Sequence, residues 1–451
     1  MPLIKDAKAT WILAWPIMIG QLAQTGTSFV DAVMAGHVSA ADLAAVSVGA
    51  SIYTMLIVTL MGLLLAISPM VAQKIGAKQH GDIPALTQQS LYQGLFAGLV
   101  AIAIAHALLP VFNHLGLSAE VNDKAQRFLS AVSWGLPALA ISRVLYGYSS
   151  ALNHTKPMMI IALISLALNI PANWLLIYGH FGFPALGAVG CGWATAFCMW
   201  ISALLWLIWI CVSPVYRDTH PFDRLRGIHW PTQWQLAKLG IPIGITFFVE
   251  VSAFSGLSLL VARLGTTSVA AHQIALNFGG LLFMIPLAIS TALTVRVAQA
   301  AGAGHWQEAR MIGQNGVRLG FIIAAMSACF VMLFDSTIAA WYTQDAQVFA
   351  LATQLLFFAG LFQFSDATQA VASGILRGYK STRIPMLLHI TAFWLIGIPL
   401  GYAMAFGLGP FEEMGAKGFW VALVIALTFA ALSLLYLFRK VSLLKLSHTP
   451  H

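Results

Sequence analysis

The chain alternates between long apolar runs and short polar breaks, and this pattern predicts most of its architecture. Each run is long enough for the roughly 20 residues that a helix needs to cross the hydrocarbon core of a bilayer. Continuous runs exclude a membrane β-barrel, whose strands are short and alternate in polarity. The first run is too long for the apolar part of a signal peptide, and we identify no cleavage-site pattern. The twelve expected spans are residues 11–34, 43–70, 87–110, 128–150, 157–179, 187–213, 235–263, 267–295, 312–334, 348–376, 384–406 and 416–438.

The second half of the sequence repeats the first at a spacing of about 226 residues. VAQKIGA at 71–77 corresponds to VAQAAGA at 297–303, and Pro16 corresponds to Pro242. Because each half has six spans, the repeats share one orientation, and transporters of this kind often bind substrate between their halves. We therefore expect an all-α membrane protein with twelve transmembrane helices. They would form two six-helix lobes related by pseudo-two-fold symmetry about the membrane normal.

One polar stretch joins the two halves. Residues 214–233 contain three prolines, three arginines and two aspartates, which is typical of a cytoplasmic linker. The expected lobes are then residues 1–213 and 234–451. The linker is too short for a nucleotide-binding domain, and the chain has no G-x-x-x-x-G-K-[ST] motif, which argues against direct ATP drive.

Composition agrees with a membrane protein, because only 8% of the residues are charged, against roughly 25% in soluble proteins. The net charge of +8 is distributed unevenly. With a cytoplasmic N-terminus, only Lys124, Arg127, Arg263 and Lys417 of the 23 Lys and Arg fall on the opposite side. This asymmetry predicts that both termini are cytoplasmic. The excess of Lys and Arg is therefore explained by the orientation of the chain in the membrane, and we expect no nucleic-acid partner.

Three carboxylates lie inside expected spans, namely Asp31, Glu250 and Asp366. A charge at the bilayer centre costs on the order of 3 kcal/mol on insertion scales. One interpretation is that each acid is neutral or paired and only fixes helix packing, and this holds best for Asp31, near the end of its span. The other is that the acids bind and release a coupling cation, since burial and a second carboxylate both favour protonation of a carboxyl group.

Polar and aromatic neighbours accompany these acids. Asn169 and Asn173 lie one helical turn apart around Pro171, and Gln273 lies in the eighth span. Such amides serve as interhelical hydrogen bonds as well as ligands. Phe362 belongs to a set of phenylalanines that suit a flat organic cation but also suit packing. Arg296 and Arg377 lie near cytoplasmic helix ends, where we expect them to snorkel. The four cysteines form no C-x-x-C pair, and the histidines show no ligand spacing, so we expect no cofactor.

Four segments resemble the multidrug and toxic compound extrusion (MATE) family, and most closely its NorM branch. They are FVDAVMAGHVSAADLAAVSVG (29–49), PIGITFFVEVS (242–252), VAAHQIALN (269–277) and SDATQAVASGILRGYKSTR (365–383). The resemblance covers nearly the whole chain. It implies a non-enzymatic, multi-pass protein of the bacterial cytoplasmic (inner) membrane. It further implies cation-coupled export of drugs and dyes, and we expect a monomer whose only other partner is membrane lipid.

The resemblance also implies roles for individual residues. Glu250 and Asp366 would form the cation site of the C-terminal lobe, either for H+ or as a Na+ site. Asp31, Asn169, Asn173 and Thr195 would form a polar site in the N-terminal lobe. Gln273, Asp345, Phe362 and Asp366 would line the substrate cleft, although Asp345 also reads as an ordinary loop acid. Many relatives carry Tyr where this chain has Phe362, and the missing hydroxyl favours H+ over Na+.

We therefore expect an antiporter in which inward movement of H+ or Na+ expels organic cations by alternating access. A flippase for a lipid-linked precursor is an alternative within the same superfamily, but it would need a cationic cleft. An intramembrane hydrolase is disfavoured, because H-E-x-x-H and G-x-S-x-G motifs are both missing from the sequence. A channel is harder to exclude, although paired halves favour a rocking motion over a fixed pore.

Overall fold

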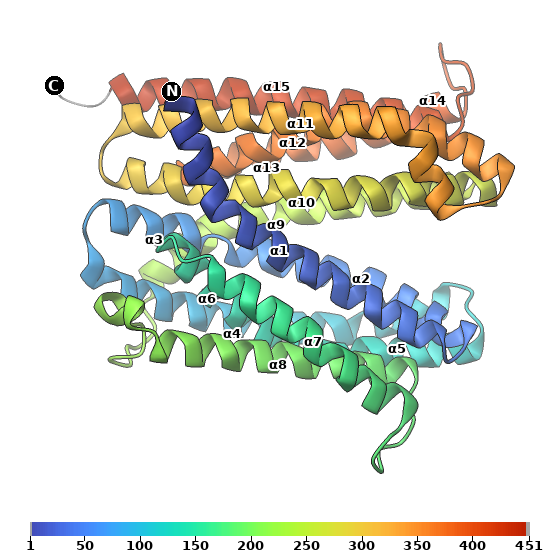
Figure 1. Cartoon of the computed structure of the whole chain (residues 1–451), viewed down its shortest axis with the longest axis horizontal. Helices are drawn as coiled ribbons and strands as arrows, with labels where there is room; N and C mark the ends of the chain where they lie inside the picture. Colours follow the sequence, from blue (N-terminus) through green and yellow to red (C-terminus); the bar gives the residue numbers. More distant parts are fainter. Residues whose placement is uncertain (1, 448–451) are drawn as a thin grey trace. The chain divides into compact units, whose positions relative to one another are not determined.

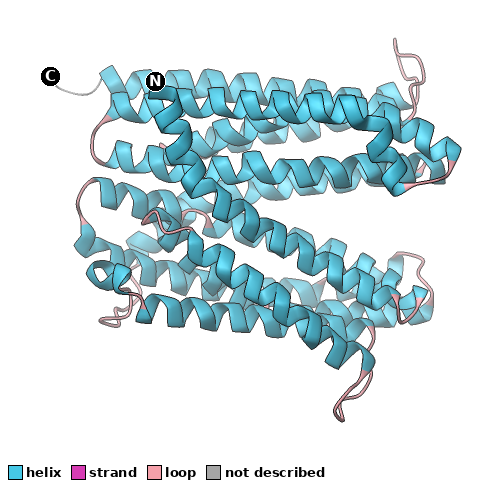
Figure 2. Ribbon diagram, viewed as in Figure 1, coloured by secondary structure: helices cyan, strands magenta, loops and turns pink. Residues whose placement is uncertain are grey.

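The computed structural model describes residues 2–447, and this part of the chain is helical with short connecting loops (Figure 2). No strand occurs within it. The helices, labelled in Figure 1, are α1 (Pro2–Gly36), α2 (Ala40–Leu64), α3 (Ile67–Gly76), α4 (Ile83–Ala107), α5 (Ala119–Ser133), α6 (Leu136–Ala151), α7 (Lys156–Tyr178), α8 (Ala188–Val212), α9 (Trp230–Ala262), α10 (Thr266–Gly302), α11 (Trp306–Tyr342), α12 (Ala346–Gly378), α13 (Arg383–Ile390), α14 (Ile398–Ala405) and α15 (Ala416–Ser447).

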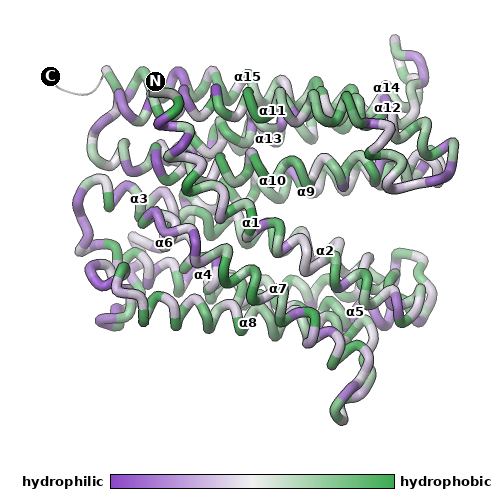
Figure 3. The backbone as a smooth tube through the Cα atoms, in the orientation of Figure 1, coloured by the Kyte–Doolittle hydropathy of each residue, from purple (hydrophilic) through white to green (hydrophobic). Residues whose placement is uncertain are grey.

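Each expected span coincides with a helix or with a pair of consecutive helices. Within residues 2–447, ten helical segments are long and apolar enough to cross a membrane, and an eleventh is added if α5 and α6 count as one span bent by 43°. Residues 11–34 lie in α1, which is outside that set. Figure 3 shows hydrophilic positions mainly at helix ends and loops. The all-α membrane fold is therefore confirmed.

Between α13 and α14 the eleventh expected span changes its winding. Residues Thr391–Gly397 form a π-helical segment that continues both helices without a break in the chain. A π-helical turn widens the helix locally and is frequent at functional sites. In this span it begins two residues after the buried His389.

The structure divides into two compact units, and the division does not follow the midpoint of the sequence. One unit is Pro16–Gly244, and the other combines the chain up to Trp15 with the chain from Ile245 on. The first stretches of α1 and α9 thus pack with the opposite half of the sequence. This grouping concerns packing, and lobe boundaries at 213 and 234 remain a prediction.

The N-terminal stretch is held to its unit by a partly buried ion pair. Arg296 on α10 donates to the Asp6 carboxylate at 2.8 Å and to the Thr10 hydroxyl at 2.8 Å. Asn315 on α11 donates to the other Asp6 oxygen at 2.6 Å. The expectation that Arg296 snorkels towards water is wrong, since its guanidinium finds a carboxylate partner inside the protein.

The linker is bonded along its length to the unit Pro16–Gly244, and we call residues 214–229 the strap. Gln88 on α4 donates to the carbonyls of Pro221 and Arg224 and accepts from Arg226 N at 3.0 Å. The next residue, Gln89, donates to Gly227 O at 2.8 Å and accepts from His229 N at 2.9 Å. Two neighbouring glutamines therefore bond to five backbone groups of the strap, from Pro221 to His229.

Two buried tyrosines fix the start of the strap. Tyr148 on α6 donates to Thr219 O at 2.9 Å, and Tyr216 lies 2.7 Å from the Ser149 hydroxyl. Since Ser149 donates to His154 O, the Tyr216 hydroxyl is the donor in that pair. Burial raises the pKa of the Tyr216 phenol, although its contact with Ser149 opposes the change. Tyr216 therefore stays a neutral donor.

Candidate functional site

The residues expected to form a polar site in the N-terminal half meet around one carboxylate. Asp31 on α1 is 7% exposed. Asn173 on α7 donates to Asp31 Oδ1 at 2.6 Å, and Thr195 on α8 donates to Asp31 Oδ2 at 2.8 Å. Asn173 also donates to Asn169 Oδ1 at 3.0 Å. Asp31 thus has donors for both of its oxygens.

The same cluster retains an unused acceptor. Asn173 Oδ1 is buried and has no hydrogen-bond partner among the described residues. Pro171, inside α7 between the two asparagines, removes one backbone donor and loosens the helix at this point. Carboxylate, amide and hydroxyl oxygens are the atoms that bind hard cations or exchange protons. The arrangement suits either role.

The C-terminal acids belong to one unit but are not hydrogen-bonded to each other. Asp366 on α12 is 5% exposed, and its Oδ1 accepts from Gln369 Nε2 at 3.1 Å. Glu250 on α9 is half-buried and close enough for its charge to act on Asp366. Among the described residues, no group of three or more His, Cys, Asp or Glu could hold a metal ion. A Na+ site at Glu250 and Asp366 remains a prediction.

Arg377 lies on the same helix as Asp366 and is 8% exposed, so the expectation that it snorkels is wrong. It donates to the Ser290 hydroxyl at 2.8 Å, and its charge interacts with that of Glu250. Close packing of α12 against α10 causes this burial. A Cβ on Gly378 would lie 2.9 Å from Val297, so only glycine fits there.

Phe362 lies one turn before Asp366 and is buried in an aromatic cluster. Its ring meets Trp420 edge-on at 5.9 Å and Phe254 at 6.1 Å. Edge-to-face pairs of this kind contribute packing energy beyond the area that they bury. The geometry therefore gives Phe362 a packing role, and a part in substrate binding remains a prediction.

The two remaining expected residues are exposed. Gln273 is an exposed residue of α10, and Asp345 directly precedes α12. Asp345 Oδ1 accepts from the backbone N–H groups of Gln347 and Val348, both at 2.9 Å, and therefore caps the helix. This is the local role of an ordinary loop acid, and a substrate role for either residue remains a prediction.

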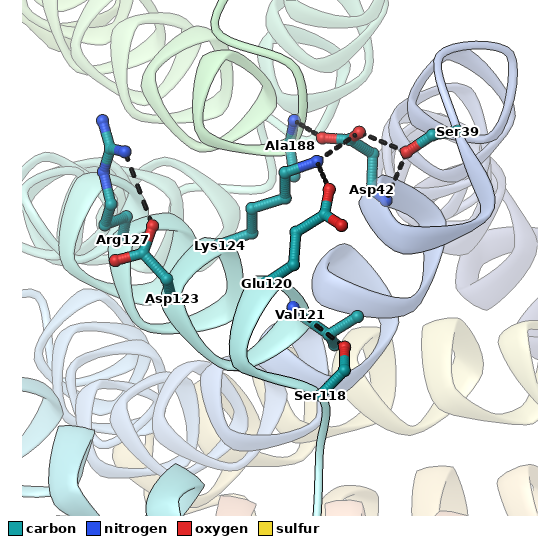
Figure 4. A network of polar contacts seen from close by, with 9 residues as sticks. All are labelled: Ser39, Asp42, Ser118, Glu120, Val121, Asp123, Lys124, Arg127 and Ala188. Carbon is teal, nitrogen blue, oxygen red and sulfur yellow. Dashed lines mark hydrogen bonds and ion pairs between the residues drawn. The ribbon is translucent and has the colours of Figure 1, made fainter.

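A buried carboxylate that the sequence pattern did not reveal lies at the start of α2. Asp42 accepts from Ala188 N at 2.8 Å, from Lys124 Nζ at 2.9 Å and from the Ser39 hydroxyl at 2.5 Å (Figure 4). It joins α2, α5 and the start of α8. We call this set the Asp42 clamp. Because Thr195 lies two turns into α8, the clamp fixes the helix that presents a hydroxyl to Asp31.

Comparisons with known proteins agree with this fold. The MatE family model matches residues 16–175 and again 242–403, so the two matches begin 226 residues apart, as the internal repeat predicts. The probable multidrug resistance protein NorM of Chromobacterium violaceum is 42% identical over 441 residues, covering 98% of this chain and 95% of the relative. The multidrug resistance protein PmpM of Pseudomonas aeruginosa is 41% identical over 430 residues, covering 95% and 90%.

Solved structures show the same architecture at lower identity. The crystal structure of the eukaryotic MATE transporter AtDTX14 has a TM-score of 0.89 at 19% identity, covering 99% of both chains. An outward-facing multidrug resistance MATE family transporter has a TM-score of 0.87 at 22% identity, covering 98% of this chain and 97% of the other.

The family match and the relatives at about 40% identity identify a multi-pass membrane transporter rather than an enzyme. The chain belongs to the MatE family, and its curated relatives include NorM and MdtK proteins at about 40% identity over nearly the full length.

Proposed function

We propose that this chain is a multidrug efflux antiporter that exports organic cations, drugs and dyes against the inward movement of H+ or Na+. The observation that carries the proposal is the burial of Asp31 and Asp366, each among polar partners, within a fold whose relatives are named multidrug resistance proteins. Neither acid has a salt-bridge partner among the described residues, which is the state expected of carboxylates that take up a cation.

The energetics are adequate for this function. One charge crossing 100 mV supplies about 2.3 kcal/mol, which supports a roughly fifty-fold substrate gradient. H+ is the favoured ion for the C-terminal acids, because Phe362 offers no hydroxyl ligand and Asp366 has only one amide partner. Low charge and apolar helices favour a broad range of substrates. We further propose a monomer in the bacterial inner membrane with both termini in the cytoplasm.

Purified protein in liposomes, preloaded with a fluorescent organic cation, tests the proposal. A pH gradient and a Na+ gradient are imposed separately on the wild type, on Asp366→Asn and on a control, Asp123→Asn. Asp123 is exposed and pairs only with Arg127. We expect one gradient to drive dye uphill in the wild type and the control, and neither to do so in Asp366→Asn.

Two other results would contradict the proposal. Dye movement that never exceeds equilibrium in any gradient would indicate a channel. No dye movement in any protein, combined with transbilayer movement of a lipid-linked precursor, would favour the flippase alternative.

A further inference from the structure

A chain of three buried side chains runs from Asp366 to a second titratable group on another helix. Gln369 on α12 donates its amide Nε2 to Asp366 Oδ1 at 3.1 Å. The amide oxygen of Gln369 lies 2.6 Å from Nε2 of His389, which is on α13. Gln369 is 2% exposed and His389 is 1% exposed, so neither exchanges partners freely with water.

His389 has an acceptor at each ring nitrogen. Its Nδ1 lies 2.8 Å from Pro385 O, a backbone carbonyl that can only accept, so this nitrogen carries a proton. Its Nε2 faces the oxygen of Gln369, which also only accepts. In this arrangement both ring nitrogens are protonated. His389 is then a cation, and Asp366 is a carboxylate that accepts from the Gln369 amide.

Turning the Gln369 amide by 180° gives the other complete arrangement. The NH2 group then donates to a neutral His389, and the amide oxygen faces Asp366, which must carry a proton to donate. Both arrangements hold the same number of protons. Removing one proton leaves two acceptors in contact at one end of Gln369, which is costly in a buried site. Adding one proton creates no such conflict, because a protonated carboxyl group keeps a carbonyl oxygen that still accepts from the Gln369 amide.

His272, a second buried histidine in the same unit, has hydrogen-bond partners that define a single protonation state. The Trp420 indole N–H donates to His272 Nδ1 at 3.2 Å, so this nitrogen is an acceptor. His272 Nε2 lies 3.2 Å from the Ser258 hydroxyl, which donates to Phe254 O at 3.0 Å. His272 Nε2 is therefore the donor. These partners define one neutral tautomer, and no carboxylate takes part.

We propose that His389 is a second proton-holding residue of the C-terminal cation site, and that Gln369 disfavours the state in which His389 and Asp366 both lack the exchangeable proton. At least one of the two groups then holds this proton. When it moves, the O–H bond of Asp366 breaks, an N–H bond forms at His389 Nε2, and the Gln369 amide turns over. No other atom or electron pair is gained or lost. The inference rests on the proposed function in taking Asp366 as the coupling carboxylate.

The charged groups near these three side chains are Arg377 on α12, near His389, and Glu250 on α9, near Asp366. Both favour the arrangement in which Asp366 carries the proton and His389 is neutral, because a cation opposes a second positive charge and an anion opposes a second negative charge. The π-helical segment and α15 also pack against α13, and within the described residues they present no charged group to His389. The His389 ring stacks on Phe393 inside the π-helical segment. A proton on His389 therefore adds charge beside a deformable part of the span.

Histidine nitrogen NMR tests the inference without requiring transport. Protein labelled with 15N-histidine is placed in lipid nanodiscs, and the His389 signal is assigned by its loss in His389→Gln. We expect the titration midpoint of His389 to differ between wild type and Asp366→Asn by about one pH unit or more. Gln369→Leu is a second variant in case Asp366→Asn does not fold. It keeps Asp366 and His389, removes the amide between them, and should shift the His389 midpoint by a comparable amount. His272 is the internal control and should be unaffected.

The pH profile of dye transport provides the second readout. We expect His389→Gln to retain gradient-driven transport with its midpoint moved by about one pH unit. An unchanged His389 midpoint in both Asp366→Asn and Gln369→Leu would overturn the inference. If wild type shows linked titration in the NMR experiment but no gradient drives dye, the proposed function fails while the proton linkage stands.

Discussion

Asp42 and Gly187 illustrate how one missing atom decides a local structure. Gly187 precedes α8 with φ of +54°, and a Cβ at this position would overlap Asp42 Oδ1. Any other residue would displace the carboxylate that binds Ala188 N and Lys124. The Asp42 clamp therefore depends on Gly187, because only a residue without a Cβ leaves room for the Asp42 carboxylate.

We predict that Gly187→Ala destabilises the protein more than Gly182→Ala does. Both glycines have positive φ, but a Cβ on Gly182 would meet no atom within 4 Å. The difference isolates the loss of the clamp from backbone strain. It should amount to about 2–3 kcal/mol, because a buried carboxylate loses its donors. Thermal unfolding in detergent measures it, and equal melting temperatures would refute the clamp.

At Asp31, Thr195→Val should remove one donor without changing the shape of the site. We expect a loss of stability on the order of 1 kcal/mol and weaker ion-driven transport, because Asp31 Oδ2 loses its 2.8 Å partner. Thr27→Val is the matched control, since that hydroxyl bonds only to Ala23 O in its own helix. If both variants transport alike, Thr195 does not take part in ion coupling.

At the residue scale, the sequence predicted that Asp31, Asn169 and Asn173 lie together, because each is a polar residue inside an apolar run. The structure places them in one hydrogen-bonded cluster, and a role in ion binding stays a prediction. Arg296 and Arg377 were misjudged, because both lie near helix ends where water would be within reach. Their burial depends on Asp6 and Ser290, which are distant in sequence.

At the scale of elements, the strap differs from what composition suggests. Prolines and charges predict a flexible tether. The structure instead bonds it to α4 through Gln88 and Gln89, two polar residues at the start of an apolar span. The sequence does not show which linker residues contact a helix more than 130 positions away, so the hydrogen bonds between the strap and α4 could not be predicted.

We predict that Gln89→Leu frees the strap. It removes hydrogen bonds to Gly227 O, His229 N and Gln233, at about 1 kcal/mol each. Trypsin cleavage after Arg224 or Arg226 should accelerate on the order of tenfold or more, because local opening exposes the backbone. Gln93→Leu, one turn further along α4, is the control and should leave the rate unchanged. Equal cleavage of both variants would mean that the strap is held by other contacts.

At the scale of the whole molecule, the even number of spans and the distribution of Lys and Arg predict one orientation in the membrane. We test this in a variant lacking the native cysteines, with single cysteines introduced by Asn122→Cys or Ser447→Cys. A membrane-impermeant maleimide should label Asn122→Cys in intact cells, and Ser447→Cys only after lysis. The reverse pattern would place the termini outside the cell.

The span pattern was sufficient to predict the all-α fold, because membrane-crossing helices must satisfy their own backbone groups and so appear as long apolar runs. The division of α1 between the two compact units, at Trp15 and Pro16, could not be predicted from the sequence. The hydropathy of residues 2–15 says nothing about which helices they contact, and the contact is made through Asp6, a residue that composition assigns to a tail.

The Asp6 ion pair also constrains the order of events during synthesis. Asp6 leaves the ribosome well before its partners Arg296 and Asn315, which follow 290 and 309 positions later. At 5–20 residues per second, the N-terminal stretch waits about 15 to 60 s for them. Throughout that interval the Asp6 carboxylate lacks its Arg296 and Asn315 partners, so α1 enters the bilayer before its N-terminal stretch is packed.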